Sequence, residues 1–372
     1  MKNIKVLIIT LLLLLISACQ PKPEKLEMFN SVSLSAGFDT YISVSVATSS
    51  QEEFDKIFNE VVEDFQYLNK LFDIYNDYEG VNNIKTINDN AGIKPVKVDP
   101  IIIDMLELSK EYYDISNHEF DITLGPVLKI WHNYRDEGLT LMQEGKFGSV
   151  PNLEELQEAY TCVGWDLVEI NKENSTVYLN KECASLDVGG IAKGFATEYI
   201  AKKLEDKNIK VGFIDAGGNN RTINTKLDNS PWRVGIQHPL GGDGALLVVN
   251  KEGSSSFVTS GDYQRYYIAE DGNQYHHIID PSTLFPANHF HSVTVITKDS
   301  GIADALSTTL FTVDYETGME IVEEFRKNHP NETLDVIWTM NKNIEINSDY
   351  VKEIDGFKVV YTKDLEDKLT WK

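Results

Sequence analysis

The chain has 372 residues, 42% of them hydrophobic, which is enough to bury a large core in one large domain or two closely packed ones. Its 58 acidic residues outnumber the 34 basic ones and give a formal net charge of −24. A nucleic-acid-binding protein is therefore disfavoured, because such proteins need a basic surface. Any site for an anion must be built locally, from backbone N–H groups, a few lysines or a metal ion.

The first twenty residues have the pattern of an export signal. Lys2 and Lys5 precede an apolar run over residues 6–16, which is too short for a membrane span and typical of a signal peptide. The sequence Leu15-Ile16-Ser17-Ala18-Cys19 then resembles the lipobox of bacterial lipoproteins, in which cleavage leaves a lipidated cysteine at the N-terminus. An ordinary signal peptide followed by an incidental cysteine is the alternative.

Cleavage at the lipobox would divide the chain into three parts. We predict a lipoprotein signal peptide over residues 1–18, a lipidated tether over 19–30 and a folded domain over 31–372. The mature protein would then be extracytoplasmic and attached to a membrane by a lipid anchor at Cys19, on the periplasmic face if the organism is Gram-negative.

The next segments alternate between strand and helix patterns. Residues 42–47 alternate apolar and small polar side chains, which predicts a strand within Thr40–Ala47. Gln51–Phe72 carries apolar residues at helical spacing, and Pro100–Ile115 begins with a proline near its start, so both are predicted helices. The polar stretch Asn76–Asn90 separates them.

Two cysteines remain after the lipobox, Cys162 and Cys183. They flank a predicted hairpin of Val168–Ile170 and Thr176–Leu179, and a disulfide is possible outside the cytoplasm. Two reduced, buried and unrelated cysteines fit the sequence equally well.

The second half of the chain mixes strands and helices without a regular alternation, which favours an α+β fold over a doubly wound sheet. The predicted helices are Gly189–Leu204, Gly301–Phe311 and Tyr315–Arg326. The predicted strands are Val211–Ile214, Trp232–Ile236, Ser256–Ser260, Tyr263–Ala269 and Ser292–Thr297.

A glycine pair opens the first of these helices, in Leu186-Asp187-Val188-Gly189-Gly190-Ile191-Ala192-Lys193-Gly194. Glycines let the backbone approach a ligand, and a helix N-terminus offers unpaired N–H groups to a phosphate. Lys193 can add a positive charge, and Asp187 can accept hydrogen bonds from a sugar or base. A glycine-rich helix start packed on a sheet explains the same spacing.

Two histidines form the second candidate group, in Tyr275-His276-His277-Ile278-Ile279-Asp280-Pro281. A histidine beside a turn is suited to general-base catalysis near neutral pH. Adjacent residues on a strand point to opposite faces, so only one of the two can line a pocket. Zinc is a poor alternative, because His289 and His291 have no third ligand motif.

The third group is Ala303-Asp304-Ala305-Leu306-Ser307-Thr308-Thr309. On a helix, Asp304 and Thr308 share a face, and a carboxylate with a hydroxyl suits Mg²⁺ completed by water and phosphate oxygens. An aspartate favoured by the helix dipole and a threonine bonded to the backbone are the commoner explanation of such a pair.

Together these groups resemble the FAD:protein FMN transferases, the ApbE-like flavin transferases, from about Phe38 to about residue 350. Further matching segments are Phe38-Asp39-Thr40, the Phe72–Asn88 region, Phe120–Pro126 with Trp131, Val163-Gly164-Trp165, Gly217-Gly218-Asn219 and Thr259–Tyr263. The resemblance implies an α+β fold with mixed sheets and flanking helices around a central FAD cleft.

The resemblance also assigns roles to residues of this chain. The expected nucleotide contacts are Phe38, Tyr75, Glu119, Phe120, Asp121, Asp187, Lys193 and Ile279. The expected metal ligands are the carbonyl of Gly190, Asp304, Thr308 and Ser307, and the expected base is His277.

The sequence departs from the family pattern at two places. Phe38 and Asp39 stand where Met and Gly are usual, and Leu284 and Phe285 replace Gly-Tyr. Because glycine is the permissive turn residue, we expect the second loop to take another shape, which affects the acceptor side and not the metal site.

The implied reaction transfers FMN from FAD to a Thr or Ser hydroxyl of an acceptor flavoprotein, such as a membrane redox-complex subunit, with Mg²⁺ and release of AMP. Hydrolysis of FAD to FMN and AMP is an alternative that uses the same site. A flavin-binding lipoprotein without turnover is an alternative of another class.

Overall fold

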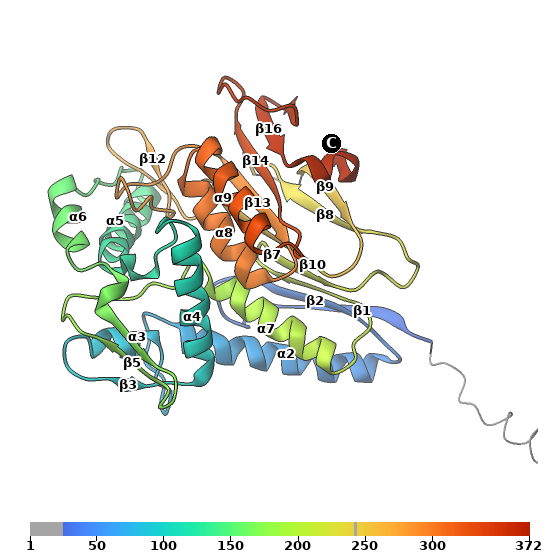
Figure 1. Ribbon diagram of the computed structural model, residues 1–372, viewed down its shortest axis with the longest axis horizontal. Helices are drawn as coiled ribbons and strands as arrows, with labels where there is room; N and C mark the ends of the chain where they lie inside the picture. Colours follow the sequence, from blue (N-terminus) through green and yellow to red (C-terminus); the bar gives the residue numbers. More distant parts are fainter. Residues whose placement is uncertain (1–24, 242–243) are drawn as a thin grey trace, which may run out of the picture.

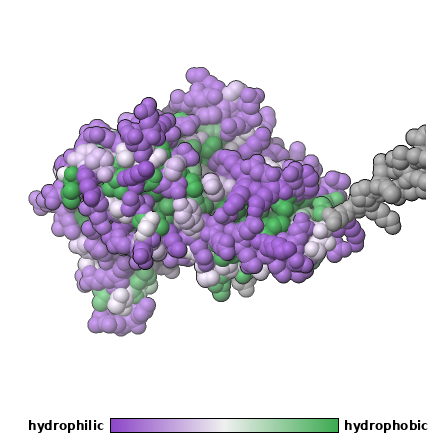
Figure 2. Space-filling model, turned by 90° about the horizontal axis from the view of Figure 1, so that it is seen from below, coloured by the Kyte–Doolittle hydropathy of each residue, from purple (hydrophilic) through white to green (hydrophobic). Residues whose placement is uncertain are grey.

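The computed structural model describes residues 25–241 and 244–372 (Figure 1). The predicted signal peptide and Cys19 lie outside these residues. Within the described ranges, none of the helices combines the length and apolar composition that a membrane span requires. The face shown in Figure 2 is mainly hydrophilic, in keeping with the excess of acidic residues.

A nine-stranded antiparallel sheet forms the centre of the fold, with the strand order β1-β2-β6-β7-β10-β13-β14-β16-β15. Its strands are β1 (Glu27–Ser33), β2 (Ile42–Thr48), β6 (Gly212–Ala216), β7 (Asn219–Ile223), β10 (Ser255–Gly261), β13 (Ser292–Thr297), β14 (Asp335–Asn341), β15 (Val351–Ile354) and β16 (Phe357–Tyr361). Some paired strands, such as β1 and β2 or β6 and β7, follow each other directly in the chain. Between β7 and β10, which also pair, the chain forms two strands of a smaller sheet.

Helices cover one face of this sheet and a smaller sheet covers the other (Figure 1). The helices are α2 (Gln51–Phe72), α4 (Pro100–Ile115), α7 (Ala192–Asp206), α8 (Ser300–Thr312) and α9 (Tyr315–Asn328). The smaller sheet is β8 (Trp232–Gln237), β9 (Ala245–Lys251) and β17 (Leu369–Trp371), which follows the 3₁₀ segment η3 (Lys363–Lys368).

Burial of both faces explains the composition of the central strands. On β13, Val293 and Val295 pack in the helix-side core, whereas Ile296 packs with the smaller sheet, and all six residues of the strand are buried. Successive side chains of a strand point to opposite faces of the sheet. A strand that is covered on both faces must therefore carry apolar side chains, or hydrogen-bonded polar ones, on both faces.

The remaining elements form a separate group at one end of the sheet (Figure 1). They are α3 (Ile84–Asp89), β3 (Val96–Lys97), η1 (Ile122–Leu124), α5 (Gly125–Gln143), α6 (Leu153–Tyr160), η2 (Trp165–Leu167), β4 (Val168–Asn171), β5 (Thr176–Leu179), β11 (Tyr267–Ile268) and β12 (Gln274–Tyr275). This group has its own small hydrophobic core, in which Trp131 of α5 packs against Tyr275 and Phe285.

The α+β prediction is confirmed, and several predicted elements have the predicted bounds. Helices α2 and α4 begin and end as expected, because Ser50 and Asp99 cap their first turns and apolar residues repeat at helical spacing. Strand β13 also matches.

Three local predictions were wrong, and one helix lies in a stretch for which no element was predicted. The predicted strand Tyr263–Ala269 is reduced to Tyr267–Ile268, since Arg265 has a left-handed φ of 50°. Helix α7 begins at Ala192, after a turn through Gly189 and Gly190, and not at Gly189. The polar stretch Asn76–Asn90 contains α3, whose N-cap Asn83 forms a capping box with Thr86. Residues 27–30, assigned to the tether, lie in β1 because that strand pairs with β2.

The disulfide question is answered by the structure, in which Cys162 and Cys183 are bonded to each other. The bond closes a loop that contains the predicted hairpin, now seen as β4 and β5. It holds the segment that leads to Asp187 and Gly190 against the end of α6, where Lys181 also bonds the carbonyl of Thr161.

Reduction of this disulfide should destabilise the protein. The cysteines are 21 residues apart, and a loop of this length corresponds to about 3 kcal/mol of unfolded-state entropy. Chemical denaturation with and without reductant measures the change, and a Cys162→Ser/Cys183→Ser variant should no longer respond to reductant. Equal unfolding midpoints of the native chain in both conditions would contradict this expectation.

Candidate active site

A cleft of about 1060 Å³ lies where the central sheet, the helix layer and the separate group of elements meet. It brings together residues that are far apart in the sequence. The predicted site residues that line it are Phe38, Tyr75, Glu119, Phe120, Asp121, Asp187, Gly190, Lys193, His277, Ile279, Asp304 and Thr308.

Ser307 is the predicted site residue that does not line the cleft. Its side chain is fully buried, its hydroxyl lies 2.9 Å from the Ser260 hydroxyl on β10, and it donates to the carbonyl oxygen of Asp304 at 3.0 Å. These bonds attach α8 to the sheet and engage the Ser307 hydroxyl away from the cleft.

Helices α7 and α8 cross in close contact beneath the cleft. Gly194 of α7 lies so near α8 that an added Cβ would collide with the carbonyl oxygen of Ser300 and lie 2.5 Å from Asp304 Cβ. Its backbone N–H donates to Asp304 Oδ2 at 2.8 Å. Gly194 is therefore required by helix packing, and the hydrogen bond fixes the carboxylate.

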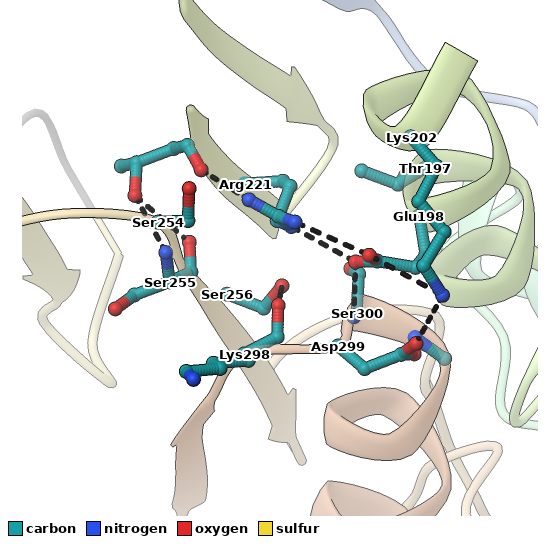
Figure 3. Close-up of polar contacts among 12 residues, drawn as sticks. Thr197, Glu198, Lys202, Arg221, Ser254, Ser255, Ser256, Lys298, Asp299 and Ser300 are labelled. Carbon is teal, nitrogen blue, oxygen red and sulfur yellow. Dashed lines mark hydrogen bonds and ion pairs between the residues drawn. The ribbon is translucent and has the colours of Figure 1, made fainter. Parts of the chain in front are cut away.

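A buried ion pair supports this crossing (Figure 3). Arg221 Nε on β7 donates to Glu198 Oε2 on α7 at 2.9 Å, and both side chains are about 5% exposed. The same carboxylate oxygen accepts the backbone N–H of Ser300 at 2.9 Å, at the start of α8. One carboxylate thus joins the sheet to both helices.

Asp304 is the buried carboxylate of the cleft. Burial raises the pKa of Asp304 to about 6, although the charge of Lys193 and the Gly194 hydrogen bond act in the opposite direction. Thr308 lies one turn further along α8, and a Cβ on Gly190 would lie 3.3 Å from its Oγ1. A carboxylate, a hydroxyl and an adjacent backbone segment are oxygen donors of the kind that Mg²⁺ prefers.

The metal site cannot be formed by protein carboxylates alone. Among residues 25–241 and 244–372, no group of three His, Cys, Asp or Glu side chains is arranged to hold a metal ion. One carboxylate leaves most positions to neutral oxygens, water and a phosphate-bearing ligand, which is the usual arrangement for Mg²⁺ at nucleotide sites.

Lys193 supplies a positive charge to the same part of the cleft. Burial lowers its pKa, and the negative charges of Asp304 and Asp215 oppose that shift. Within the described residues its ammonium group forms no ion pair shorter than 4 Å, so it is available to an anion bound in the cleft.

The side chains of His276 and His277 point in different directions, as predicted for neighbouring residues of a strand. The two residues nevertheless follow β12 and are not part of a strand. His276 is buried away from the cleft, with Nε2 2.7 Å from the carbonyl oxygen of Ala287 and its ring against Phe311. His277 lines the cleft, and its buried Nδ1 has no hydrogen-bond partner. Burial, followed by the charge of Arg265, holds the pKa of His277 well below its usual range, so its ring is neutral near pH 7 and can accept a proton.

Both departures from the family pattern lie at left-handed backbone positions. Phe38 and Asp39 have φ values of 58° and 51°, and the Phe38 N–H donates to Asn69 Oδ1 at 2.7 Å. Leu284 has φ 64°, and its carbonyl accepts from Trp131 Nε1 at 2.9 Å. Leu284 therefore adopts the left-handed conformation that glycine favours, and the shape of its loop relative to that of the family stays a prediction.

Sequence reasoning missed several residues of the cleft. His132 and Arg135 lie on α5, which no periodic pattern predicted, because few of its residues are buried and its N-terminus has no side-chain cap. Asn219 was named only within the segment Gly217-Gly218-Asn219 and given no role, but it is buried at the cleft, where its side chain lies beside the Asp304 carboxylate.

Comparison with known proteins gives one family. The model of the ApbE family matches residues 38–331. A Klebsiella pneumoniae protein named FAD:protein FMN transferase is 28% identical over 287 residues, which cover 76% of this chain and 83% of that protein. A Treponema pallidum protein of the same name is 33% identical over 257 residues, covering 65% and 68%.

Solved structures agree in fold. The ApbE protein of Thermotoga maritima superposes with a TM-score of 0.68 at 30% identity, covering 84% of this chain and 94% of that one. The flavin transferase ApbE of Vibrio cholerae superposes with a TM-score of 0.70, covering 92% and 100%, and at 21% identity this similarity concerns the fold alone.

The raised pKa of Asp304 predicts a pH-dependent stability. The folded state holds this proton up to about pH 6, whereas the unfolded state loses it near 3.8, so the free energy of unfolding falls as pH rises between these values. Asp304→Asn removes the buried charge and should be more stable than the native chain by about 2 kcal/mol at pH 7.5 without divalent cations. Urea denaturation at pH 4 and 7.5 measures the difference, which should shrink at pH 4.

The matched control is Asp136→Asn, which changes a carboxylate that is 72% exposed on α5. It should give the same stability difference from the native chain at both pH values. A difference for Asp304→Asn that is likewise independent of pH would contradict the assignment of a buried, weakly acidic carboxyl.

Proposed function

The chain belongs to the ApbE family, and from this membership and the cleft we propose that it is an FAD:protein FMN transferase. It moves FMN from FAD to a Thr or Ser hydroxyl of an acceptor protein and releases AMP. The observation that carries the proposal is the meeting in one cleft of a neutral His277 with a free nitrogen, Lys193 and the Asp304–Thr308 pair.

FAD is the substrate that this cleft would bind. The turn through Gly189 and Gly190 and the start of α7 line the cleft, and the glycines let a pyrophosphate approach the backbone closely there. Lys193 adds a charge there. The rings and polar groups further along the walls suit the nucleotide moieties, and these residues are Phe38, Tyr75, Glu119, Phe120, Asp121, Asp187 and Ile279.

Mg²⁺ fits the oxygen donors of Asp304, Thr308 and the Gly190 carbonyl. When bound there it would neutralise charge on the pyrophosphate. Asp304 must lose its proton to serve as a ligand, and its pKa of about 6 means that it does so near neutral pH.

His277 is the proposed base. Its neutral ring accepts the proton of the acceptor hydroxyl, whose oxygen attacks the phosphorus on the FMN side of the pyrophosphate. The new phosphoester bond joins FMN to the acceptor, the bond to the AMP phosphate breaks, and AMP leaves with the electron pair. Lys193 faces the negative charge that moves onto the leaving phosphate.

Replacement of His277 tests this assignment. His277→Ala should lower FMN transfer to an acceptor by about a hundredfold or more, with FAD binding retained, because proton removal is lost while the nucleotide contacts remain. The transfer is measured as added FMN mass on a Thr or Ser of the acceptor, in the presence of FAD and Mg²⁺. His329→Ala, which removes a histidine stacked on Phe325 of α9, is the control and should transfer normally.

Other outcomes would reject parts of the proposal. Release of AMP without a protein adduct, across several family-type acceptors, would assign the cleft to FAD hydrolysis. Bound FAD without AMP release would assign it to flavin binding alone. Undiminished transfer by His277→Ala would show that another group accepts the proton.

We further propose that the enzyme is held at the extracytoplasmic face of a membrane by lipid on Cys19. The lipobox-like sequence before Cys19 supports this anchor. An anchored enzyme would meet acceptors such as subunits of membrane redox complexes or extracytoplasmic flavoproteins at the membrane surface.

The anchor can be tested by fractionation of the producing cells. Cys19→Ala should move the protein from the membrane fraction to the soluble fraction or leave it as an uncleaved precursor, because the lipid attachment site is gone. A variant that is cleaved normally and still sediments with membranes would contradict a lipid anchor at this residue.

A further inference from the structure

Three polar side chains from separate parts of the chain form a row along one wall of the cleft. Tyr75 lies in the loop between α2 and α3, His132 lies on α5, and Asp187 precedes the turn into α7. The Tyr75 hydroxyl lies 2.9 Å from His132 Nδ1, and His132 Nε2 lies 3.6 Å from Asp187 Oδ2. His132 is thus the link between two residues expected to contact the nucleotide.

The protonation of the row follows from its surroundings. Burial of the hydroxyl, followed by the charge of Asp187, raises the pKa of Tyr75 to about 12, so the hydroxyl is a donor at neutral pH. Burial lowers the pKa of His132, against the effect of Asp187. Arg135, Asp136 and Arg265 are the other charges that act on the imidazole, and the two arginines also favour its neutral form.

A neutral His132 has one arrangement that satisfies both neighbours. Tyr75 donates its proton to Nδ1, and the N–H of Nε2 is directed to the Asp187 carboxylate. The reverse tautomer would place an unprotonated nitrogen opposite the carboxylate, which is unfavourable. Asp187 in turn accepts the Gly189 N–H at 2.9 Å, so the row ends at the glycine turn beside the candidate metal site.

Besides His132, the Arg135 side chain also lies near the Tyr75 hydroxyl. Tyr75 is 59% exposed although it lines the cleft. The base of its loop is fixed, because the Asp73 carboxylate accepts the N–H groups of Tyr75 and Asn76 and the hydroxyl of Tyr78. The hydrogen bond between the Tyr75 hydroxyl and His132 Nδ1 sets the direction of the ring. A large exposed aromatic face on a cleft wall suits the stacking of a planar aromatic ligand.

We propose that His132 is a positioning residue for substrate binding, which holds the Tyr75 ring in the orientation that stacks on an aromatic ring of FAD and fixes Asp187 on its other side. The inference rests on the proposed function, because FAD supplies that ring. It assigns to α5 a role in nucleotide affinity and none in the proton transfer at His277.

Two conservative replacements separate the hydrogen bond of His132 to Tyr75 from its contact with Asp187. Asparagine places an oxygen near the position of Nδ1 and can still accept from Tyr75, whereas glutamine reaches the position of Nε2 and loses that bond. In the full chain with FAD and Mg²⁺, His132→Gln should weaken FAD binding about five- to tenfold, the effect of one lost hydrogen bond, and His132→Asn should stay within about twofold of the native chain. FAD fluorescence measures the dissociation constant without an acceptor.

A double-mutant cycle with Tyr75→Phe supplies a result that a merely structural role would not give. Tyr75→Phe should weaken binding as much as His132→Gln, and the double variant should be no weaker than either, because both remove the same bond. In transfer assays KM for FAD should rise while kcat changes less than about twofold. Tyr134→Phe is the control, since Tyr134 is also on α5 but its hydroxyl donates to Glu155 on α6, outside the cleft.

The outcomes are distinguishable. Additive losses in the double variant, equal losses for His132→Asn and His132→Gln, or unchanged FAD affinity in a folded His132→Gln would each overturn the role of His132. Absence of FAD binding by the native chain would overturn the proposed function instead. Thermal unfolding of every variant separates loss of binding from loss of fold.

Discussion

The close crossing of α7 and α8 is the constraint on which the cleft depends. Gly194 allows the helices to touch, and its N–H fixes the Asp304 carboxylate. The Glu198 carboxylate holds the start of α8 and is itself held by Arg221 on the central sheet. Because both ions are buried, removal of either partner would leave an uncompensated charge and would strongly destabilise this connection. Lys193, Asp304 and Thr308 are thereby kept within one cleft.

The polar side chains to which we assign metal binding and catalysis are buried in an unfavourable environment when no ligand is bound. Asp304 is a buried carboxyl with a raised pKa, and the Nδ1 of His277 is buried without a partner. Such groups reduce stability unless a ligand satisfies them. Their concentration in one cleft therefore fits a site that is completed by a metal ion and a phosphate-bearing substrate, and the surrounding core must offset their cost.

The sequence could predict the elements whose signals are local. Helices α2 and α4 have caps and an apolar face, and the order of short motifs indicated the family and most of the cleft residues. It could not predict α5, whose buried residues are few, and so it missed His132. It also could not place Ser307, since the bond to Ser260 depends on which strand packs against α8. The pairing of Cys162 with Cys183 likewise depends on tertiary structure.

The most direct test of this account is the FAD affinity of Gly194→Ala in the presence of Mg²⁺. The added Cβ must separate α7 from α8, so we expect FAD binding to weaken more than about tenfold in a protein that still folds. Gly318→Ala on α9 is the matched control, because its Cβ would make only ordinary contacts from 3.5 Å, and it should bind FAD normally. Native FAD affinity in Gly194→Ala would contradict the claim that this crossing builds the site.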